Sequence, residues 1–387
     1  MSVNTKKEIR NKVHYFDYSL LAIIMFLMGF GLIMLYSASS YSAQVNYGNS
    51  MHFFLRQGFF CLFGFGVMLV VAKIDYHKWA KFGLGMYVFS FFLMALVLTP
   101  LGKEVNHARR WIRLPMGQTF QPSEFTKIAV IAFVPVLLCH ASKKAYDAWT
   151  YWKIIGIGAL AAAGVYILTD NLSTAVIVMG IVCVVVFLAN PKTAKFVIIA
   201  AVGTVLLTIG IKLLDMAMDT STSFRLRRIL VWLHPEEYIQ EGGYQVMQGL
   251  YAIGSGGFFG KGLGNSAQKM MIPEAQNDMI LAIICEELGV FGAIVLLTMF
   301  GILLHRLVYI AKHAPDRYGF LIVSGVFAHI ALQVVLNVAV VLNVIPTTGI
   351  TLPFVSYGGT STVFLMIEMG FVMSVSNRIE FDEPVET

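Results

Sequence analysis

The stretch YQVMQGLYAIGSGGFFGKGLGNSAQKMMIPEAQNDMILAIICEELG, from Tyr244 to Gly289, is the longest polar, glycine-rich interruption in a chain that otherwise consists of apolar runs. Its one aspartate, Asp278, stands where an apolar run begins. A carboxylate at the edge of a bilayer is costly and usually functional. The stretch therefore predicts a bundle of membrane helices with a polar site at its mouth.

The composition supports a membrane protein. The 387 residues are 57% hydrophobic and 13% charged, with a mean hydropathy of +0.73, whereas a soluble domain carries roughly 25% charged residues. We expect one membrane-embedded domain. The net charge of +6 fits loops that face anionic lipid headgroups; because the basic residues stand singly between spans, it does not indicate nucleic acid. The 4 cysteines lie in apolar runs without metal-ligand spacing, as core residues do.

Apolar runs of about 20 residues predict ten spans. They cover residues 18–37, 53–73, 80–101, 122–140, 153–170, 172–190, 195–213, 277–304, 318–343 and 358–377. An even number of spans places both termini on one side. The chain then divides into a cytoplasmic N-terminal tail (1–17), an all-α ten-helix membrane domain (18–378) with a large outer loop at about 214–276, and a cytoplasmic C-terminal tail (379–387).

The basic residues set the orientation. With the N-terminus inside, most of the 28 lysines and arginines fall on the inner side, as the positive-inside rule requires. Two outer clusters depart from that pattern, and arginine binds phosphate in a bidentate manner. They indicate either an anionic ligand on the outer face or ordinary loop solubility, and charge alone leaves both open. The clusters are Lys103, Arg109, Arg110 and Arg113, and Arg225, Arg227, Arg228, Lys261 and Lys269.

The outer loop at 214–276 is too rich in aromatic residues to be disordered, so it should pack on the membrane surface with short amphipathic helices. Its glycine run, Gly254–Gly264, differs from a phosphate loop, since Ser255 stands in place of the first glycine and Gly262 follows Lys261. Two interpretations remain. The run either lets backbone N–H groups and Lys261 and Lys269 approach an oxyanion, or forms a tight turn between helices.

Two acids near the end of this loop are candidates for chemistry. Glu274 and Asp278 are four residues apart and share a face if the helix starts early, and Pro273 favours such a start. Asp278 would then lie in the first turn, at the boundary between water and membrane. A carboxylate there suits a general base for a substrate hydroxyl, or an acid that stabilises the helix dipole. Asp170, at the start of the sixth span, is interpreted as a cap.

Glu286 and Glu287 lie about 12–14 Å deeper at 1.5 Å per residue, where an acid needs a partner. Lys127, three residues after Glu124, is the best available cation in the membrane. We predict a structural ion pair of Lys127 with Glu286 or Glu287. Glu368, in the last span, has no partner that the sequence identifies.

The segment from Tyr318 to Ile367 contains no Asp, Glu, Lys or Arg, but prolines and glycines interrupt it at 346–349 and 353–359. Irregular backbone at membrane depth is tolerated only against protein or a cavity. The pattern therefore predicts a re-entrant segment or a loop that lines a groove.

Together these segments resemble the SEDS family (shape, elongation, division and sporulation) of bacterial cell-wall glycosyltransferases. The similar pieces follow one another along nearly the whole chain: Arg110-Trp111-Ile112, Gln121-Pro122-Ser123-Glu124, Gly243-Tyr244-Gln245, Gly254-Ser255-Gly256-Gly257 through Gly264-Asn265-Ser266, Pro273-Glu274-Ala275, Glu286-Glu287-Leu288-Gly289 and Leu352-Pro353-Phe354-Val355-Ser356-Tyr357-Gly358-Gly359. The sequence of Gly264–Lys269 resembles the division branch, FtsW and its sporulation relatives, more than the elongation branch, RodA.

The resemblance implies a polymerase of lipid II, the undecaprenyl-diphosphate-linked disaccharide-pentapeptide. The family's catalytic aspartate corresponds to Asp278. Here Gln276-Asn277 precedes it, where many members have His-Thr, so the flanking contacts differ. The remaining candidate substrate-binding residues are Arg109, Arg110, Trp111, Lys261, Lys269, Glu274 and Ser356.

The resemblance also implies the setting of the reaction. The ligands are lipid II and the undecaprenyl-diphosphate-linked glycan. The partners are a class B penicillin-binding protein, which is a transpeptidase, and other division proteins, in the bacterial cytoplasmic membrane at the division septum. No cofactor is required and no cluster of metal ligands is evident, although a divalent cation is compatible with the sequence. A lipid II flippase and a non-catalytic scaffold of the division machinery are the alternatives; a flippase would need a polar path across the bilayer.

Overall fold

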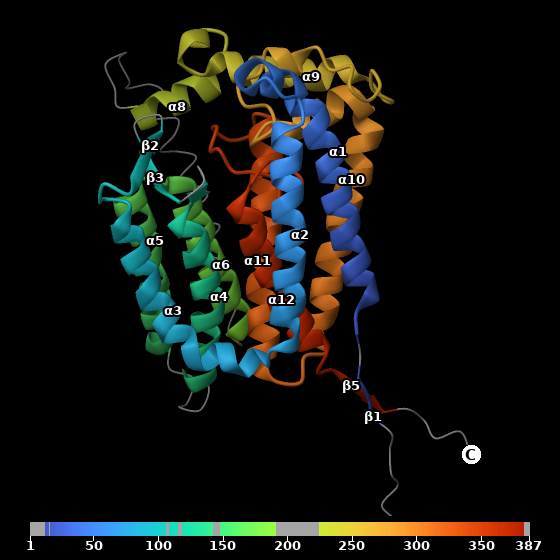
Figure 1. Cartoon of the computed structure of the whole chain (residues 1–387). Helices are drawn as coiled ribbons and strands as arrows, with labels where there is room; N and C mark the ends of the chain where they lie inside the picture. Colours follow the sequence, from blue (N-terminus) through green and yellow to red (C-terminus); the bar gives the residue numbers. More distant parts are fainter. Residues whose placement is uncertain are drawn as a thin grey trace, which may run out of the picture.

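The computed structural model describes residues 12–14, 16–105, 108–114, 118–141, 148–190 and 224–382. Within them, eight helices are long and apolar enough to cross a membrane. These are α1 (Tyr18–Tyr47), α2 (His52–Lys73), α3 (Tyr76–Leu96), α4 (Pro122–Ala141), α5 (Ala148–Thr169), α6 (Leu172–Ala189), α10 (Ile280–Lys312) and α11 (Arg317–Val341), and the shorter apolar helix α12 (Thr360–Ser376) joins them (Figure 1).

The helical membrane architecture is confirmed, and each described span matches a predicted one with shifted ends. The largest shift is at the end of the first span, because α1 continues to Tyr47, whereas we expected an end at residue 37. The third span begins earlier than expected, at Tyr76, where the Asp75 side chain caps α3 by accepting from the His77 N–H. The seventh predicted span, 195–213, lies outside the described residues.

Helices α4 and α11 form the centre of the bundle. In each of them 67% of the most apolar 18-residue window is buried, compared with 22% in α3. Helix α11 packs against α4, α6, α10 and α12, and α12 also packs closely along α2. Side chains such as Leu62 and Ile167 point outward, where a bilayer would cover them. Polar groups on α4 and α11 are therefore shielded from the lipid by the surrounding helices.

The two ends of the bundle differ. At one end, strands β1 (Lys12–His14) and β5 (Glu380–Asp382) pair antiparallel, so the two terminal segments lie together (Figure 1). The opposite end carries a three-stranded sheet of β2 (Gly102–Val105), β3 (Ala108–Arg113) and β4 (Thr119–Phe120). It also carries α8 (Phe224–Leu233), α9 (Gly243–Gly256) and the 3₁₀ turns η2 (Ile239–Glu241) and η3 (Gln268–Met270). Over its described part, the long loop thus forms the short helices that its sequence predicts.

Helix α10 is broken inside the membrane region at Gly289, which has φ 68° and ψ −170°. The break leaves backbone N–H and C=O groups without helical partners, and the loop after α9 forms hydrogen bonds with them. The Glu286 and Glu287 carbonyls accept from the N–H groups of Lys261 and Gly262, while the N–H groups of Val290 and Phe291 donate to the carbonyls of Gly257 and Phe258. Loop and helix are joined here as a short ladder, which is how irregular backbone is satisfied at depth.

This ladder explains the glycine run. A Cβ at Gly256 would overlap the Cys285 carbonyl, and one at Gly260 would overlap the Glu287 carbonyl. Gly260 also has a positive φ of 80°. The glycines therefore allow the loop to lie directly on the backbone of α10. Of the two interpretations of the run, the structure shows the close turn between helices.

The expected early start of α10 is wrong. Residues 271–279 form turns, and the helix begins at Ile280 after the N-cap Met279. Glu274 has a left-handed backbone with φ 48°, which no helix would accommodate. Asp278 consequently precedes the helix instead of lying in its first turn, and Glu274 and Asp278 do not share a helical face.

Candidate active site

A cavity of about 740 Å³ opens at the end of the bundle that carries α8 and α9. It lies between the β2–β4 sheet, α4, α6, α8, α9, the turn before α10, α11 and the irregular segment before α12. The predicted groove-lining role of that last segment is confirmed. The side chains and backbone that line the cavity come from residues 56, 103, 110, 111, 118, 119, 121, 124, 127, 171, 173, 174, 177, 228, 245, 273, 274, 277, 278, 333, 347–351 and 357–361.

The lining is positively charged. Five basic side chains face three acids around the cavity, so its electrostatics favour an anion that bears more than one charge. The basic residues are Arg56, Lys103, Arg110, Lys127 and Arg228, and the acids are Glu124, Glu274 and Asp278.

Hydrogen bonds fix the backbone around Asp278. The buried Asn337 side chain of α11 donates to the carbonyls of Asp278 at 2.8 Å and Ile350 at 2.7 Å. The Tyr357 N–H donates to the Gln276 carbonyl at 2.9 Å. The turn before α10 is thereby tied to both the central helix and the irregular segment. Asp278 is held in place by its backbone while its carboxylate remains directed to the cavity.

The Asp278 carboxylate itself has few partners. Gln245 of α9 donates to its Oδ1 at 3.5 Å, which is a weak contact. Burial raises the pKa of Asp278 to about 6 and the nearby Glu274 carboxylate adds to the rise, whereas its own backbone N–H, Arg228 and Gln245 lower it. Such a group is mostly ionised at neutral pH yet basic enough to accept a proton from a hydroxyl.

Strand β3 positions Arg110 and Trp111 at the cavity wall. The Arg110 guanidinium donates from Nε and Nη2 to the Asp170 carbonyl, at 3.2 Å and 3.0 Å. Asp170 has a positive φ of 50° and is not the cap of α6, as we expected; Asn171 is, since its side chain accepts from the Thr174 N–H. A left-handed Asp170 turns its carbonyl toward the arginine.

Arg109, the neighbour of Arg110 on β3, is not at the cavity. It is exposed and pairs with Glu104 of β2 at 3.2 Å. This pair with Glu104 holds the Arg109 side chain away from the cavity that Arg110 lines. Among the sequence-predicted residues, the cavity brings together Asp278, Glu274, Arg110 and Trp111.

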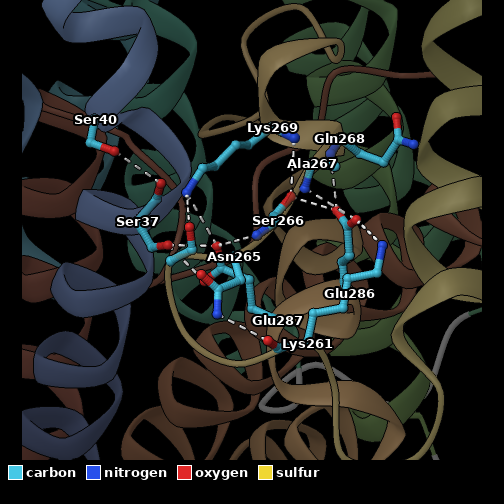
Figure 2. Close-up of polar contacts among 11 residues, drawn as sticks. Ser37, Ser40, Lys261, Asn265, Ser266, Ala267, Gln268, Lys269, Glu286 and Glu287 are labelled. Atoms are coloured by element: carbon cyan, nitrogen blue, oxygen red, sulfur yellow. Dashed lines mark hydrogen bonds and ion pairs between the residues drawn. The ribbon is translucent and has the colours of Figure 1, made fainter.

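Lys261 and Lys269 lie in a separate cluster around the break in α10 (Figure 2). Lys261 Nζ is 2.6 Å from Glu286 Oε1, and Lys269 Nζ is 3.6 Å from Glu287 Oε1. Neither lysine lines the cavity of Asp278. The predicted pairing of Lys127 with Glu286 or Glu287 is therefore wrong, because the broken helix draws the loop over α10 and supplies its own lysines.

The same cluster satisfies both fully buried glutamates. Ser266 Oγ, together with the Ala267 and Gln268 N–H groups, donates to Glu286. Ser37 of α1 donates to Glu287 at 2.6 Å (Figure 2). The cluster thus ties α1, the outer loop and α10 together, and its role in the described structure is to hold the loop.

Lys127 has other partners. Its Nζ lies 2.9 Å from Glu124 Oε1 and 2.9 Å from His329 Nε2. His329 Nδ1 in turn lies 2.7 Å from Glu368 Oε2, which gives Glu368 the partner that the sequence did not identify. Both Glu124 and Lys127 line the cavity. The only sequence signal for this connection was the histidine in an otherwise uncharged span.

Ser356 is buried behind the cavity wall. Its Oγ accepts from the Leu352 N–H at 2.8 Å and closes the turn of residues 352–356. The Gln57 side chain of α2 accepts from the N–H groups of Gly358 and Gly359, at 3.3 Å and 3.0 Å. Ser356 therefore shapes the wall from behind. Sequence reasoning missed Arg56, Gln118 and Gln245, which reach the cavity from distant segments.

In the described residues, no three His, Cys, Asp or Glu side chains are grouped so that they could hold a metal ion.

Comparison with known proteins identifies the family. The model of the FtsW, RodA and SpoVE family, described as "cell cycle protein", matches residues 18–380. The chain belongs to this family. Two curated FtsW/RodA/SpoVE relatives illustrate the similarity. The stage V sporulation protein E of Bacillus subtilis is 38% identical over 93% of this chain and 96% of its own length. A probable peptidoglycan glycosyltransferase FtsW of Geobacter sulfurreducens is 35% identical over 95% of this chain and 97% of its own.

Solved structures of the FtsW/RodA/SpoVE family show the same fold. One is a chain of a structure described as "Structural coordination of polymerization and crosslinking by a peptidoglycan synthase complex". Its TM-score is 0.76 at 25% identity, over 93% of this chain and 97% of that chain. The crystal structure of the rod shape determining protein RodA of Thermus thermophilus has a TM-score of 0.66 at 24% identity, over 94% and 97%.

Proposed function

We propose that this chain is a peptidoglycan glycosyltransferase that polymerises lipid II into glycan strands. The observation that carries the proposal is the cavity, in which one carboxylate with a raised pKa, Asp278, faces a lining with five basic side chains. That combination suits deprotonation of a neutral hydroxyl beside a leaving group with several negative charges. Family membership and the names of the relatives support the same reaction.

In the proposed reaction, Asp278 accepts the proton of the acceptor sugar 4-hydroxyl. The oxygen attacks the anomeric carbon of the donor glycan and forms the new glycosidic bond. The bond from that carbon to the lipid diphosphate breaks, and the diphosphate leaves with the electron pair. Because the Asp278 pKa is about 6, the carboxylate is in its acceptor form at neutral pH.

The basic lining neutralises the leaving diphosphate. We assign this role first to Arg110 and Arg228, since guanidinium groups bind phosphate oxygens in pairs, and then to Arg56 and Lys103. Trp111 and Glu274 line the same cavity and can contact the sugars. No resident metal is required in this scheme. A divalent cation, if used, would arrive with the diphosphate.

We place the cavity on the outer face of the bacterial cytoplasmic membrane, with both termini in the cytoplasm. The pairing of β1 with β5 at the end opposite α8 and α9 supports this arrangement (Figure 1). We further propose a class B penicillin-binding protein as partner and the division septum as location. The similarity to a chain of a peptidoglycan synthase complex supports the partner.

The decisive experiment uses the purified protein with its cognate transpeptidase and labelled lipid II, for wild type and Asp278→Asn. We expect glycan polymer from wild type and none from a folded mutant. Equal polymer from both would remove Asp278 from the mechanism. No polymer from either protein, with the partner bound, would favour the flippase or the scaffold.

A further inference from the structure

A row of four ionisable side chains runs from the cavity into the centre of the bundle. Glu124 and Lys127 of α4 line the cavity, and His329 of α11 and Glu368 of α12 lie behind them. The exposed fractions of Lys127, His329 and Glu368 are 2%, 1% and 0%. The contacts between successive members are 2.9 Å, 2.9 Å and 2.7 Å.

The chemistry of the groups fixes the direction of each hydrogen bond. A lysine ammonium has only donors, so the Nε2 atom of His329 accepts from Lys127. The ring proton of a neutral histidine then lies on Nδ1, from which it is donated to Glu368. In the described residues, the other oxygen of Glu368 is buried without a hydrogen-bond partner. The row therefore ends at Glu368, which accepts from the ring and so fixes its orientation toward Lys127.

Stability alone does not account for such a row. Taking charges out of water costs several kcal/mol per ion, and replacing a buried ion pair by apolar side chains is often neutral or stabilising. In metal sites, a carboxylate behind a histidine fixes the orientation of the ring and makes its other nitrogen a better ligand. The same arrangement here has an ammonium in place of the metal. Glu124 and the ring hold Lys127 from two sides, so its Nζ atom has a fixed position at the cavity wall.

We propose that His329 and Glu368 are positioning residues, which hold the Lys127 ammonium as a fixed cation at the cavity wall for the diphosphate of the lipid substrate. This inference rests on the proposed function of the cavity. A lysine on a flexible stem otherwise loses rotamer freedom when it binds phosphate. Fixing it in advance removes that cost and makes its charge available when the leaving group develops.

The test compares His329→Leu, which removes the acceptor, with His329→Gln, which keeps one. We expect His329→Leu to weaken binding of undecaprenyl diphosphate and to lower kcat on the order of 10- to 100-fold, and His329→Gln to recover most of that loss. Glu368→Leu and Glu368→Gln should follow the same pattern. Ser324→Ala is the matched control, because Ser324 is a buried residue of α11 whose hydroxyl, among the described residues, bonds only the Phe320 carbonyl of its own helix.

A double-mutant cycle separates positioning from simple structural support. Binding of undecaprenyl diphosphate is measured from the shift in thermal unfolding, in wild-type and Lys127→Met backgrounds. We expect His329→Leu to change the affinity less than twofold once Lys127 is absent. An equal loss in both backgrounds overturns the positioning role even if wild type polymerises lipid II. If the affinities follow the expected cycle but the wild-type protein makes no polymer, the positioning role is supported and the polymerase function is refuted.

Discussion

At the residue scale, Asp278 gives the first prediction, the pH dependence of the reaction. A general base works only when ionised, and burial together with Glu274 raises the Asp278 pKa to about 6. The rate should therefore fall about tenfold per pH unit below 6 and level off above it. Glu274→Gln removes a like charge and should move this acid limb of the pH–rate profile to lower pH. Arg228→Met removes an opposite charge and should move the limb to higher pH. Polymerisation rates from pH 4.5 to 8 provide the measurement; identical limbs in all three proteins would refute the assignment.

The same raised pKa predicts a stability effect of opposite sign to the usual one for an acid. The folded-state pKa of about 6 exceeds the ordinary 3.8, so ionisation of Asp278 costs stability that accumulates as pH rises from 4 to 6 and stays constant above. Asp278→Asn should therefore stabilise the protein at pH 7.5, by at most about 3 kcal/mol, and hardly at pH 4. Thermal unfolding in detergent at both pH values measures this.

Asp316 is the control for that stability effect. Although burial opposes it, hydrogen bonds from the Gly319 N–H and Tyr76 and the nearby His77 lower the Asp316 pKa. Its carboxylate contributes stability that is present above the ordinary pKa and is lost as pH falls through the lowered one. Asp316→Asn should hence lower the melting temperature at pH 7.5, where Asp278→Asn raises it. A decrease for both would show that cavity polarity, not ionisation, governs stability at Asp278.

How far sequence could identify the site is clear from these residues. Asp278 was predictable because its signal is local: an acid where an apolar run begins. The connection of Lys127 to His329 and Glu368 was not, because these two residues are more than 200 residues away along the chain and only helix packing brings them together. Lys261 and Lys269 do not line the cavity of Asp278, for a different reason. A lysine near a glycine run is typical of phosphate sites, and the sequence does not show that α10 breaks at Gly289.

At the element scale, the break in α10 predicts a strict requirement for glycine. Gly289 has φ 68° and ψ −170°, a region that only glycine occupies readily, and a Cβ there would overlap the Phe258 carbonyl. Gly289→Ala should lower the free energy of unfolding by roughly 2 kcal/mol or more. Gly301→Ala, in the same helix with open space around its Cβ, should be neutral or slightly stabilising. Equal melting temperatures for the two variants would show that the helix is not broken.

The cluster at that break predicts that Lys261 supports the fold and not the ligand. Lys261→Met leaves the buried Glu286 without its cation, so the melting temperature should fall. Binding of undecaprenyl diphosphate by the folded protein should change less than threefold, since Lys261 does not line the cavity. Arg110→Met should weaken the same binding at least tenfold. If Lys261→Met weakens the binding of undecaprenyl diphosphate without lowering the melting temperature, Lys261 binds the substrate after all.

The helices themselves were predictable from the sequence to a large extent. Apolar runs of about 20 residues indicate the positions and order of the described spans, because bilayer thickness sets helix length. Helix ends were less certain. The start of α10 shifted to Ile280, because Glu274 takes a left-handed backbone. Hydrogen bonds from Asn337 and Tyr357, in distant segments, hold the turn at Asp278 and Gln276.

At the scale of the whole molecule, the arrangement predicts which end faces outward. The paired strands β1 and β5 and the helices α8 and α9 lie at opposite ends of the bundle (Figure 1). Phe259, in the loop after α9, is 76% exposed, and Lys312, at the end of α10, is also exposed. In intact cells, a membrane-impermeant maleimide should label Phe259→Cys, and should label Lys312→Cys only after the membrane is permeabilised.

The native cysteines make this labelling experiment interpretable. Cys61 and Cys285 are buried and Cys139 and Cys183 are half-buried, so the unmodified chain should give little background. The opposite labelling pattern would place the Asp278 cavity on the cytoplasmic side. A lipid II polymerase would then have to release glycan inside the cell, and the proposed function would fail whatever the chemistry of the site. The proposed reaction at the cavity therefore requires that the cavity face the outside of the cell.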